Sequence, residues 1–381
     1  MNSRELFGRA LCAISVLLTS SAVALGQNAP VTDSVMTGKG EGSPPLSSET
    51  AVDQSQCADC CDAGCCQPCL CPRWTASAEF ICFERIGGVN QTLVSTYPPH
   101  DPLVPGTGVE RLNANDLHEG FAGGPRLGLI RHGDCGYDLE VSYFQIDGWS
   151  GVGDIAPNYV PGPLAPPPNW LVFTAPGNFL QLTDYPDQHM VWTYATRLYN
   201  AELNVRRDLS PRVTVLAGFR WVKLWEDLQG TMPTERVVPF WDTKTNNNLY
   251  GFQIGGEWKM LNRSRFSIDG LVKAGIFDNN ADETAAVSIY RTLYWESAST
   301  NHAAFLGEVG LRCKYQLTER LLLKAGYEAM WLEGVALAPA QISRTTSHAV
   351  PVTDVYVQSL GVDSSSGAFF HGATVGLEYA F

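Results

Sequence analysis

The last fourteen residues, Ala368 to Phe381, place the strongest constraint on how this chain folds. Taken in steps of two, they alternate between an apolar set that ends in Phe381 and a set of small or polar residues. Successive side chains of a β-strand point to opposite faces, so this segment predicts a strand with one apolar and one polar face. A soluble β-sandwich contains such strands too. The rest of the chain must therefore show whether the protein is a soluble sandwich or a membrane protein.

Nine further segments upstream alternate in the same way. They begin at Trp74, Phe121, Tyr137, Tyr199, Val213, Tyr250, Phe266, Phe305 and Leu321. Each runs for roughly ten to fifteen residues, which covers the 9–11 that a tilted strand needs to cross hydrocarbon and exceeds the five or six of an average soluble strand. The length of these segments therefore favours strands that span a membrane.

The connections between the predicted strands alternate strictly between short and long. The short ones follow the even-numbered strands, at 131–134, 207–211, 261–264 and 316–319; the long ones are 84–120, 147–191, 227–247, 278–301 and 334–367. Short periplasmic turns and long outer loops are typical of outer-membrane barrels. We expect an all-β protein, a closed antiparallel transmembrane β-barrel of about ten strands. Segments 286–295 and 352–362 are extended enough to lengthen hairpins above the membrane or to raise the count to twelve.

The amino terminus predicts export from the cytoplasm. Arg4 and Arg9 precede an apolar run from Ala10 to Leu25, followed by small residues. Residues 1–26 are therefore predicted to be a secretory signal peptide. Residues 27–56 are polar and predict a disordered linker, residues 57–72 form a Cys-rich segment, and residues 73–381 are assigned to the barrel. The expected location is the cell outer membrane.

The Cys-rich segment is expected to form disulfides. It contains Cys57, Cys60, Cys61, Cys65, Cys66, Cys69 and Cys71. An oxidising compartment favours disulfides, and the odd number leaves one thiol for another part of the chain or for another chain. The alternative is a zinc site, because two Cys-x-x-Cys pairs supply four thiolates. A disulfide-linked homo-oligomer, or a link to another envelope protein, follows from the first interpretation. Cys82, Cys135 and Cys313 are expected to be isolated small apolar residues.

The polar phase of the predicted strands, meaning the alternate residues that form their polar faces, carries as many bases as acids. The predicted lumen-lining acids are Glu79, Asp138, Glu140, Glu202, Glu257, Asp269, Glu308, Glu328 and Glu378, and the bases are Arg126, Arg206, Arg212, Arg220, Lys259, Lys273, Arg312, Lys314 and Lys324. About eight strands leave an interior just filled by side chains, while sixteen to eighteen leave an aqueous channel. The sequence thus predicts a narrow or plugged lumen laced by ion pairs.

The sequence contains no recognisable catalytic motif. The seven histidines show no HExxH spacing, and no GxSxG occurs. We therefore expect no enzyme, no cofactor and no metal centre. The net charge of −13 argues against nucleic acid as a partner. The expected partners are outer-membrane lipid and the machinery that inserts barrels.

The opening WTASAEFICF, from Trp74 to Phe83, and the closing GATVGLEYAF, from Gly372 to Phe381, carry a family resemblance. Together with the signal peptide and the Cys-rich segment, they resemble the putative beta-barrel porin family 7 of planctomycetes. The resemblance implies an outer-membrane barrel with porin activity and transfers no functional residue. Two functions fit: a narrow pore for ions or small solutes, or a non-conducting structural protein that anchors acidic outer loops and the Cys-rich segment in the envelope.

Overall fold

The computed structural model describes residues 73–96, 109–117, 119–133, 136–156, 171–173, 189–232, 240–289, 292–350 and 354–381. The predicted signal peptide, linker and Cys-rich segment lie outside the described residues. Among the described residues, none of the helices has the length and apolar character needed to cross a membrane.

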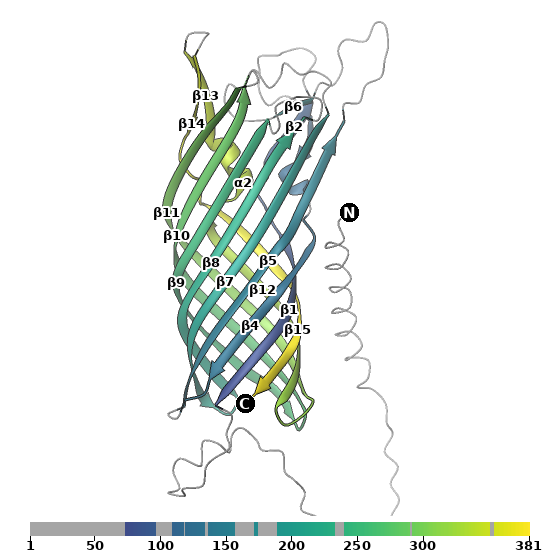
Figure 1. Cartoon of the computed structure of the whole chain (residues 1–381), viewed down its shortest axis with the longest axis vertical. Helices are drawn as coiled ribbons and strands as arrows, with labels where there is room; N and C mark the ends of the chain where they lie inside the picture. The colour runs from purple at the N-terminus through teal and green to yellow at the C-terminus, as the bar shows by residue number, and fades with distance from the viewer. Residues whose placement is uncertain are drawn as a thin grey trace, which may run out of the picture.

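Ten antiparallel strands form a closed barrel, as the sequence predicted (Figure 1). In ring order they are β1 (Trp74–Ile86), β15 (Ser366–Ala380), β12 (Leu321–Val335), β11 (Thr292–Gln316), β10 (Phe266–Ile289), β9 (Trp241–Arg263), β8 (Val213–Thr231), β7 (Met190–Ser210), β5 (Tyr137–Ile155) and β4 (Phe121–Arg131). β1 pairs with β15 on one side and with β4 on the other, which closes the ring.

The remaining elements lie apart from the ring. β2 (Thr92–Thr96), β3 (Glu110–Asn113) and β6 (Leu171–Phe173) form a small sheet, and β13 (Thr345–Val350) pairs with β14 (Asp354–Ser359). The short helices are η3 (Ala114–Asp116), α2 (Ala338–Gln341) and η4 (Ile342–Arg344). Segment 286–295 lies at the tip of the β10–β11 hairpin, and segment 352–362 contains β14. The first segment lengthens a hairpin of the barrel and the second belongs to a separate two-stranded sheet, so neither adds a strand to the ring.

The closing strand works as a seam. Its register with β1 runs from Thr75 opposite Ala380 to Ile86 opposite Phe369. Beyond the strand end, the Phe381 N–H donates to the Trp74 carbonyl over 2.9 Å, and the Trp74 N–H donates to the Phe381 carbonyl over 3.0 Å. The carboxy-terminal strand thus joins the two ends of the barrel.

Apolar side chains form an exposed belt around part of the barrel. On β9, Phe252 is 77% exposed and Ile254 is 69% exposed, and the belt ends in Tyr250. The next residue on the same face is Asn248, and β8 Lys223 lies beside it in the register. Lys223, which interrupts the apolar phase in sequence, therefore lies just beyond the outer edge of the belt. A belt of this kind is the surface that faces hydrocarbon in an outer-membrane barrel.

Beyond the belt the two faces of the long strands exchange character. Strands β7 to β11 are 19–25 residues long, so their outer ends continue past Tyr250. There the outward residues are polar, as with Asn248 and Asp282, while the inward residues Leu198, Val222 and Leu249 are buried. The outer part of the barrel is thus built like a water-soluble barrel with an apolar core, a change that the sequence analysis did not anticipate.

The cysteines of the barrel differ from expectation. Cys82 on β1 is disulfide-bonded, whereas Cys313 on β11 is free. The expectation that the three cysteines are isolated was wrong for Cys82, in keeping with an oxidising compartment. Cys135 lies outside the described residues.

Candidate functional site: the barrel interior

Arg220 lies at the centre of a polar layer inside the membrane-spanning part of the barrel. It comes from β8, yet its Nη1 donates to the Glu308 Oε2 on β11 over 2.8 Å. Its Nε donates to the Asn200 Oδ1 on β7 over 2.6 Å, and Glu202 Oε1 lies 3.6 Å from its Nη2. Strands β8 and β11 are not neighbours in the ring, so this contact crosses the interior. The Arg220 side chain is fully buried.

Lys273 completes the charge balance of this layer. Its Nζ lies 2.8 Å from Glu202 Oε2 and 3.6 Å from Glu308 Oε1. Two bases, Arg220 and Lys273, therefore share two carboxylates, and Gln253 donates to Glu202 over 2.8 Å. Buried charges that are paired and hydrogen-bonded in this way are tolerated in a low-dielectric interior.

A second set of ion pairs lies nearer the inner end. Arg126 on β4 and Arg312 on β11 both bind Glu328 on β12, at 2.7 and 2.9 Å. Lys324 binds Glu79 over 2.5 Å, and Arg206 on β7 binds Glu257 on β9 over 2.7 Å. Several of these pairs again join strands that are not neighbours, so they also fill the interior.

The structure brings most of the predicted lumen-lining residues into these ion pairs. They are Glu79, Arg126, Glu140, Glu202, Arg206, Arg220, Glu257, Asp269, Lys273, Glu308, Arg312, Lys314, Lys324, Glu328 and Glu378. Asp138 lies near the inner rim, where its Oδ2 is 2.9 Å from the Nδ1 of His132. Arg212 and Lys259 lie exposed at the same rim, where the Lys259 N–H donates to the Arg212 carbonyl over 2.8 Å.

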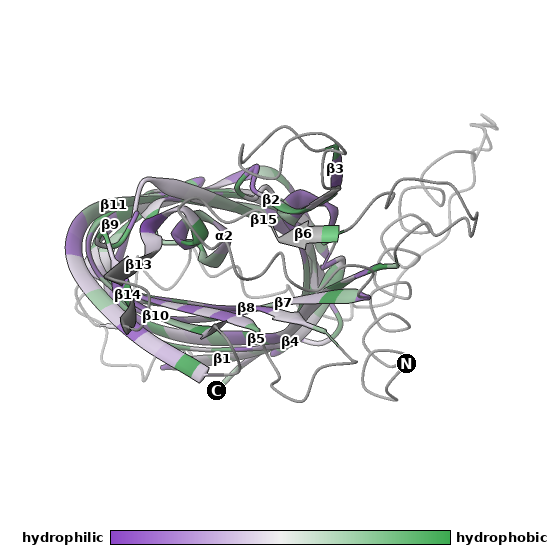
Figure 2. Cartoon of the chain, turned by 90° about the horizontal axis from the view of Figure 1, so that it is seen from above, coloured by the Kyte–Doolittle hydropathy of each residue, from purple (hydrophilic) through white to green (hydrophobic). Residues whose placement is uncertain are grey.

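Above the polar layer, one segment of chain fills the barrel as a plug. We define the plug as residues 335–342, which begin at the last residue of β12 and include α2. Gly334 makes the turn into it with φ +83, a backbone conformation that favours glycine. In the view along the barrel, α2 lies within the ring of strands (Figure 2). Val335, Leu337 and Ile342 are completely buried against the apolar interior residues of the strands.

Side-chain amides and a carboxylate hold the plug. Asn247 on β9 donates its Nδ2 to the Ala336 carbonyl over 2.8 Å, and its Oδ1 accepts the Ala336 N–H over 2.7 Å. Asn279 on β10 donates to the Gly334 carbonyl over 3.0 Å. Glu226 on β8 accepts the Ala338 N–H over 2.8 Å. These bonds satisfy backbone groups that lie inside the apolar layer.

Glu226 belongs to a buried cluster that sequence reasoning missed. Arg85 on β1 donates to Glu226 over 2.5 Å, to Glu119 over 2.9 Å and to the Tyr194 hydroxyl over 2.7 Å. Burial raises the pKa of Glu119, which precedes β4, to about 7, although Arg85 acts against this. Glu226 falls on the same phase as Arg220, so extending the strand periodicity beyond Trp225 would have found it.

The exposed fraction of the interior side chains shows how tightly the polar layer and the plug layer are packed. Arg220, Asn200, Asn204 and the apolar residues Leu224 and Leu332 show no exposed area. A water-filled lumen would leave its lining side chains accessible. The side chains named here therefore fill the barrel at the levels where they lie.

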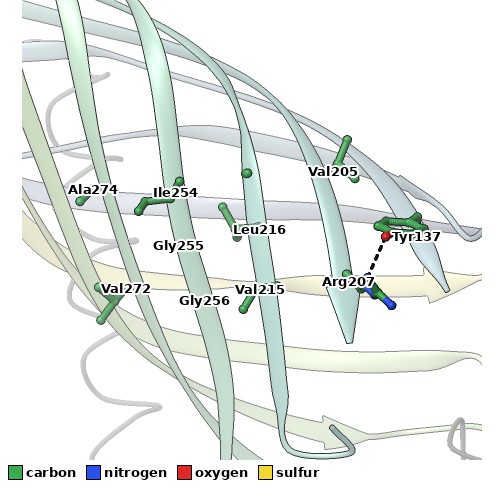
Figure 3. Close-up of a pocket in the computed structure, with 11 residues that line it drawn as sticks. Tyr137, Val205, Arg207, Val215, Leu216, Ile254, Gly255, Gly256, Val272 and Ala274 are labelled. Atoms are coloured by element: carbon green, nitrogen blue, oxygen red, sulfur yellow. Dashed lines mark hydrogen bonds between the residues drawn. The ribbon is translucent and has the colours of Figure 1, made fainter. Parts of the chain in front are cut away.

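The groove in Figure 3 lies on the outer wall of the barrel. It measures about 610 Å³ and is lined by Val215, Ala217, Gly256, Val272 and Ala274, with Arg207 and Tyr137 at its end. These residues belong to the outward phase, and small side chains such as Gly256 make the hollow. The Arg207 Nη1 donates to the Tyr137 hydroxyl over 2.8 Å. The groove faces lipid.

Among the described residues, no group of three or more His, Cys, Asp or Glu side chains is arranged to hold a metal ion. The predicted disulfide candidates from Cys57 to Cys71 lie outside the part of the chain that the structure describes.

The family is decided by the carboxy-terminal half of the chain. The family model described as Putative beta barrel porin-7 matches residues 192–381, from β7 to the end of the closing strand. The chain belongs to this family. It is an outer-membrane β-barrel protein, and the Putative beta barrel porin-7 model covers the plug, Arg220 and most of the ion pairs described above.

Similar solved structures were also found. The outer membrane protease OmpT of Escherichia coli is 10% identical, with a TM-score of 0.44, over 81% of this chain and 96% of that one. The toluene transporter TbuX of Ralstonia pickettii is 9% identical, with a TM-score of 0.30, over 81% and 89%. The toluene transporter TodX of Pseudomonas putida is 10% identical, with a TM-score of 0.28, over 81% and 90%. No curated protein matches the chain.

Proposed function

We propose that the protein is an outer-membrane barrel with a closed lumen, which serves the envelope through the surface it presents outside the membrane. The observation that carries this proposal is the double filling of the interior by the ion-paired layer around Arg220 and by the plug above it. Passive diffusion needs a continuous water path. Two independent layers, one held by charges and one by apolar packing, would both have to open to provide one.

Planar-bilayer recording on the purified full-length protein tests the proposal. The expected result is no stepwise conductance over a wide range of voltages, beside an open porin reconstituted in the same way as a positive control. Vesicles that contain the protein should likewise not swell in sugar solutions faster than empty vesicles. Stable conductance steps from the wild-type protein would overturn the proposal and restore the narrow-pore function.

A gated narrow pore is the second candidate, and the composition of the plug favours it. The plug is one continuous segment. Apart from the bond to the Glu226 carboxylate, Asn247 and Asn279 hold it with neutral hydrogen bonds, which contribute only about 0.5–1.5 kcal/mol each. Gating predicts brief openings at high voltage that become frequent when Asn247 is replaced by Ala. Recordings without openings in either protein would exclude this candidate.

We propose that the envelope role also involves lipid and protein partners. The barrel contacts outer-membrane lipid through its apolar belt, and the Cys-rich segment 57–72 links it to a second copy or to another envelope protein. Non-reducing gels should then show a larger species that reductant converts to the monomer. Migration as a monomer without reductant would argue against the link. No catalytic role is part of the proposal.

A further inference from the structure

The outer part of the β10–β11 hairpin carries two carboxylates on its inward face. The register pairs Glu283 with Ala298 and Ala285 with Glu296, so Glu283 and Glu296 are diagonal neighbours. Diagonal positions on one face of an antiparallel pair lie about 7–8 Å apart, and long side chains reach across that distance. Both acids lie beyond the level of Tyr250, outside the membrane-spanning part of the barrel.

Both carboxylates are buried without compensation. Glu283 is 1% exposed, and all four carboxylate oxygens of Glu283 and Glu296 are buried without a hydrogen-bond partner. Burial raises the pKa of Glu283, and the Arg344 charge opposes this rise only in part. Its guanidinium, however, donates to the Gly361 and Leu360 carbonyls, at 3.1 and 3.2 Å. Carboxylates buried in this way are unfavourable unless a proton or a cation neutralises them.

A buried hydroxyl without a hydrogen-bond partner is an independent indication of a ligand at this place. Thr245 on β9 lies directly opposite Glu283 in the register and shares its inward face. The Thr245 side chain is 0% exposed, and its Oγ1 has no hydrogen-bond partner. Burial raises the pKa of Glu296, and Thr345, at the start of β13, acts against this rise. The register thus places oxygen-bearing side chains of three neighbouring strands on one inward face, with the first residue of a fourth strand beside them.

We propose that Glu283, Glu296 and Thr245 bind a calcium ion in the outer part of the barrel. The donors are all oxygens, which hard divalent cations prefer. Ca²⁺ accepts six to eight oxygen ligands in flexible geometry, so water and backbone carbonyls complete the shell, whereas Mg²⁺ demands stricter octahedral geometry. The ion would join the β9, β10 and β11 wall to the start of β13 through Thr345. This site is independent of whether the lumen conducts.

Protonation is the competing way to neutralise the two acids. Burial and the neighbouring Glu296 raise the pKa of Glu283 to about 8. Without a cation, Glu283 is therefore largely protonated at neutral pH, and binding of Ca²⁺ releases that proton. Affinity should consequently rise with pH, as it does wherever ligands must deprotonate.

The test uses full-length protein in detergent, stripped of metal with a chelator. Calcium binding is measured by calorimetry, and the Tm is measured with and without CaCl2, with MgCl2 in parallel. The variants are Glu283→Gln and Glu296→Gln. Asp282→Asn is the matched control, because Asp282 is the adjacent acid on β10 and faces outward, exposed. Slower migration after heating on a gel verifies that each variant is folded.

We expect wild type and Asp282→Asn to bind one Ca²⁺ and to gain Tm, with a smaller gain in Mg²⁺, and both Gln variants to lose binding at least tenfold. Terbium provides a second readout, since Trp241 lies on the same face of β9 as Thr245 and should sensitise its emission. No calcium heat in the wild type, or equal binding by the Gln variants, would overturn the site. A wild type that does not bind and a Glu283→Gln variant that is more stable would show that protonation alone satisfies the pair.

Discussion

Arg220 and Glu308 meet inside the barrel although β9 and β10 separate their strands in the ring, and the Arg220 Nη1 donates to the Glu308 Oε2 over 2.8 Å. The pair therefore connects two parts of the wall that are three strands apart in the ring. Because Glu202 also lies 3.6 Å from Arg220, removal of this one base disturbs two buried acids.

Replacing Arg220 by Met should destabilise the barrel strongly. Loss of one partner of a buried ion pair typically costs about 3–5 kcal/mol, because the remaining charge stays buried. The measurement is the free energy of unfolding in urea, followed by tryptophan fluorescence in vesicles. Arg212→Met is the control: Arg212 is exposed at the inner rim, and its loss should change stability by about 0.5 kcal/mol or less. Equal effects of the two variants would contradict the cross-barrel role of Arg220.

Replacing Asn247 by Ala should loosen the plug. Both amide atoms of Asn247 bond to Ala336, so the variant leaves buried backbone groups unpaired, at a cost of about 1–3 kcal/mol for each unsatisfied group. Hydrogen exchange should increase at residues 335–342 and change little in the inner halves of the strands. Asn248→Ala, on the opposite face of the same strand, is the control. Unchanged exchange in the plug of the Asn247 variant would show that apolar packing alone holds it.

The level of the membrane can be checked with arginine on β9. Ile254 lies in the exposed apolar belt and Asn248 lies on the same face beyond Tyr250. Arginine near the bilayer midplane costs about 2–4 kcal/mol, and near the interface about 0–1 kcal/mol. Ile254→Arg should therefore reduce the free energy of folding into vesicles far more than Asn248→Arg does. The reverse order would place the membrane at a different level of the barrel.

Stability in the presence of a chelator should fall as pH rises. The pKa of Glu283 is about 8 in the folded protein and has an ordinary value of 4.5. Between these values the folded state binds more protons than the unfolded state, so the free energy of unfolding decreases with increasing pH. Tm measured from pH 5 to 9 should decline, and Glu283→Gln should flatten the decline. The same slope in both proteins would assign the pH dependence to other groups.

The strand periodicity was sufficient to predict the membrane-spanning half of the molecule. Phe252 and Ile254 lie outward and Gln253 inward as the alternation required, and the ion pairs of Arg220 and Glu202 involve residues that the polar phase selected. The physical reason is that lipid imposes one rule on every strand: apolar side chains outward, polar side chains inward.

The outer half followed a different rule, and for that reason it was missed. Beyond Tyr250 the phase of the strands continues but the solvent changes, so Leu249 becomes a core residue and Asn248 a surface residue. The plug was assigned to a long loop, although the apolar run from Val335 to Ala338 contrasts with its polar neighbours. Its clamp by Asn247 depends on a contact between residues 89 positions apart, which no local pattern reveals.

The exchange of faces at Tyr250 also bears on how the barrel finds its correct pairing. Sliding a strand by one residue would turn charged side chains toward the acyl chains below that level. The same shift would expose leucine side chains to water above it. A shift of register therefore costs free energy twice here, once in lipid and once in water, whereas it costs free energy only in lipid for a strand that ends at the membrane surface. Long strands therefore favour the correct register during assembly. The fidelity of pairing should be greatest for the strands that extend furthest out of the bilayer.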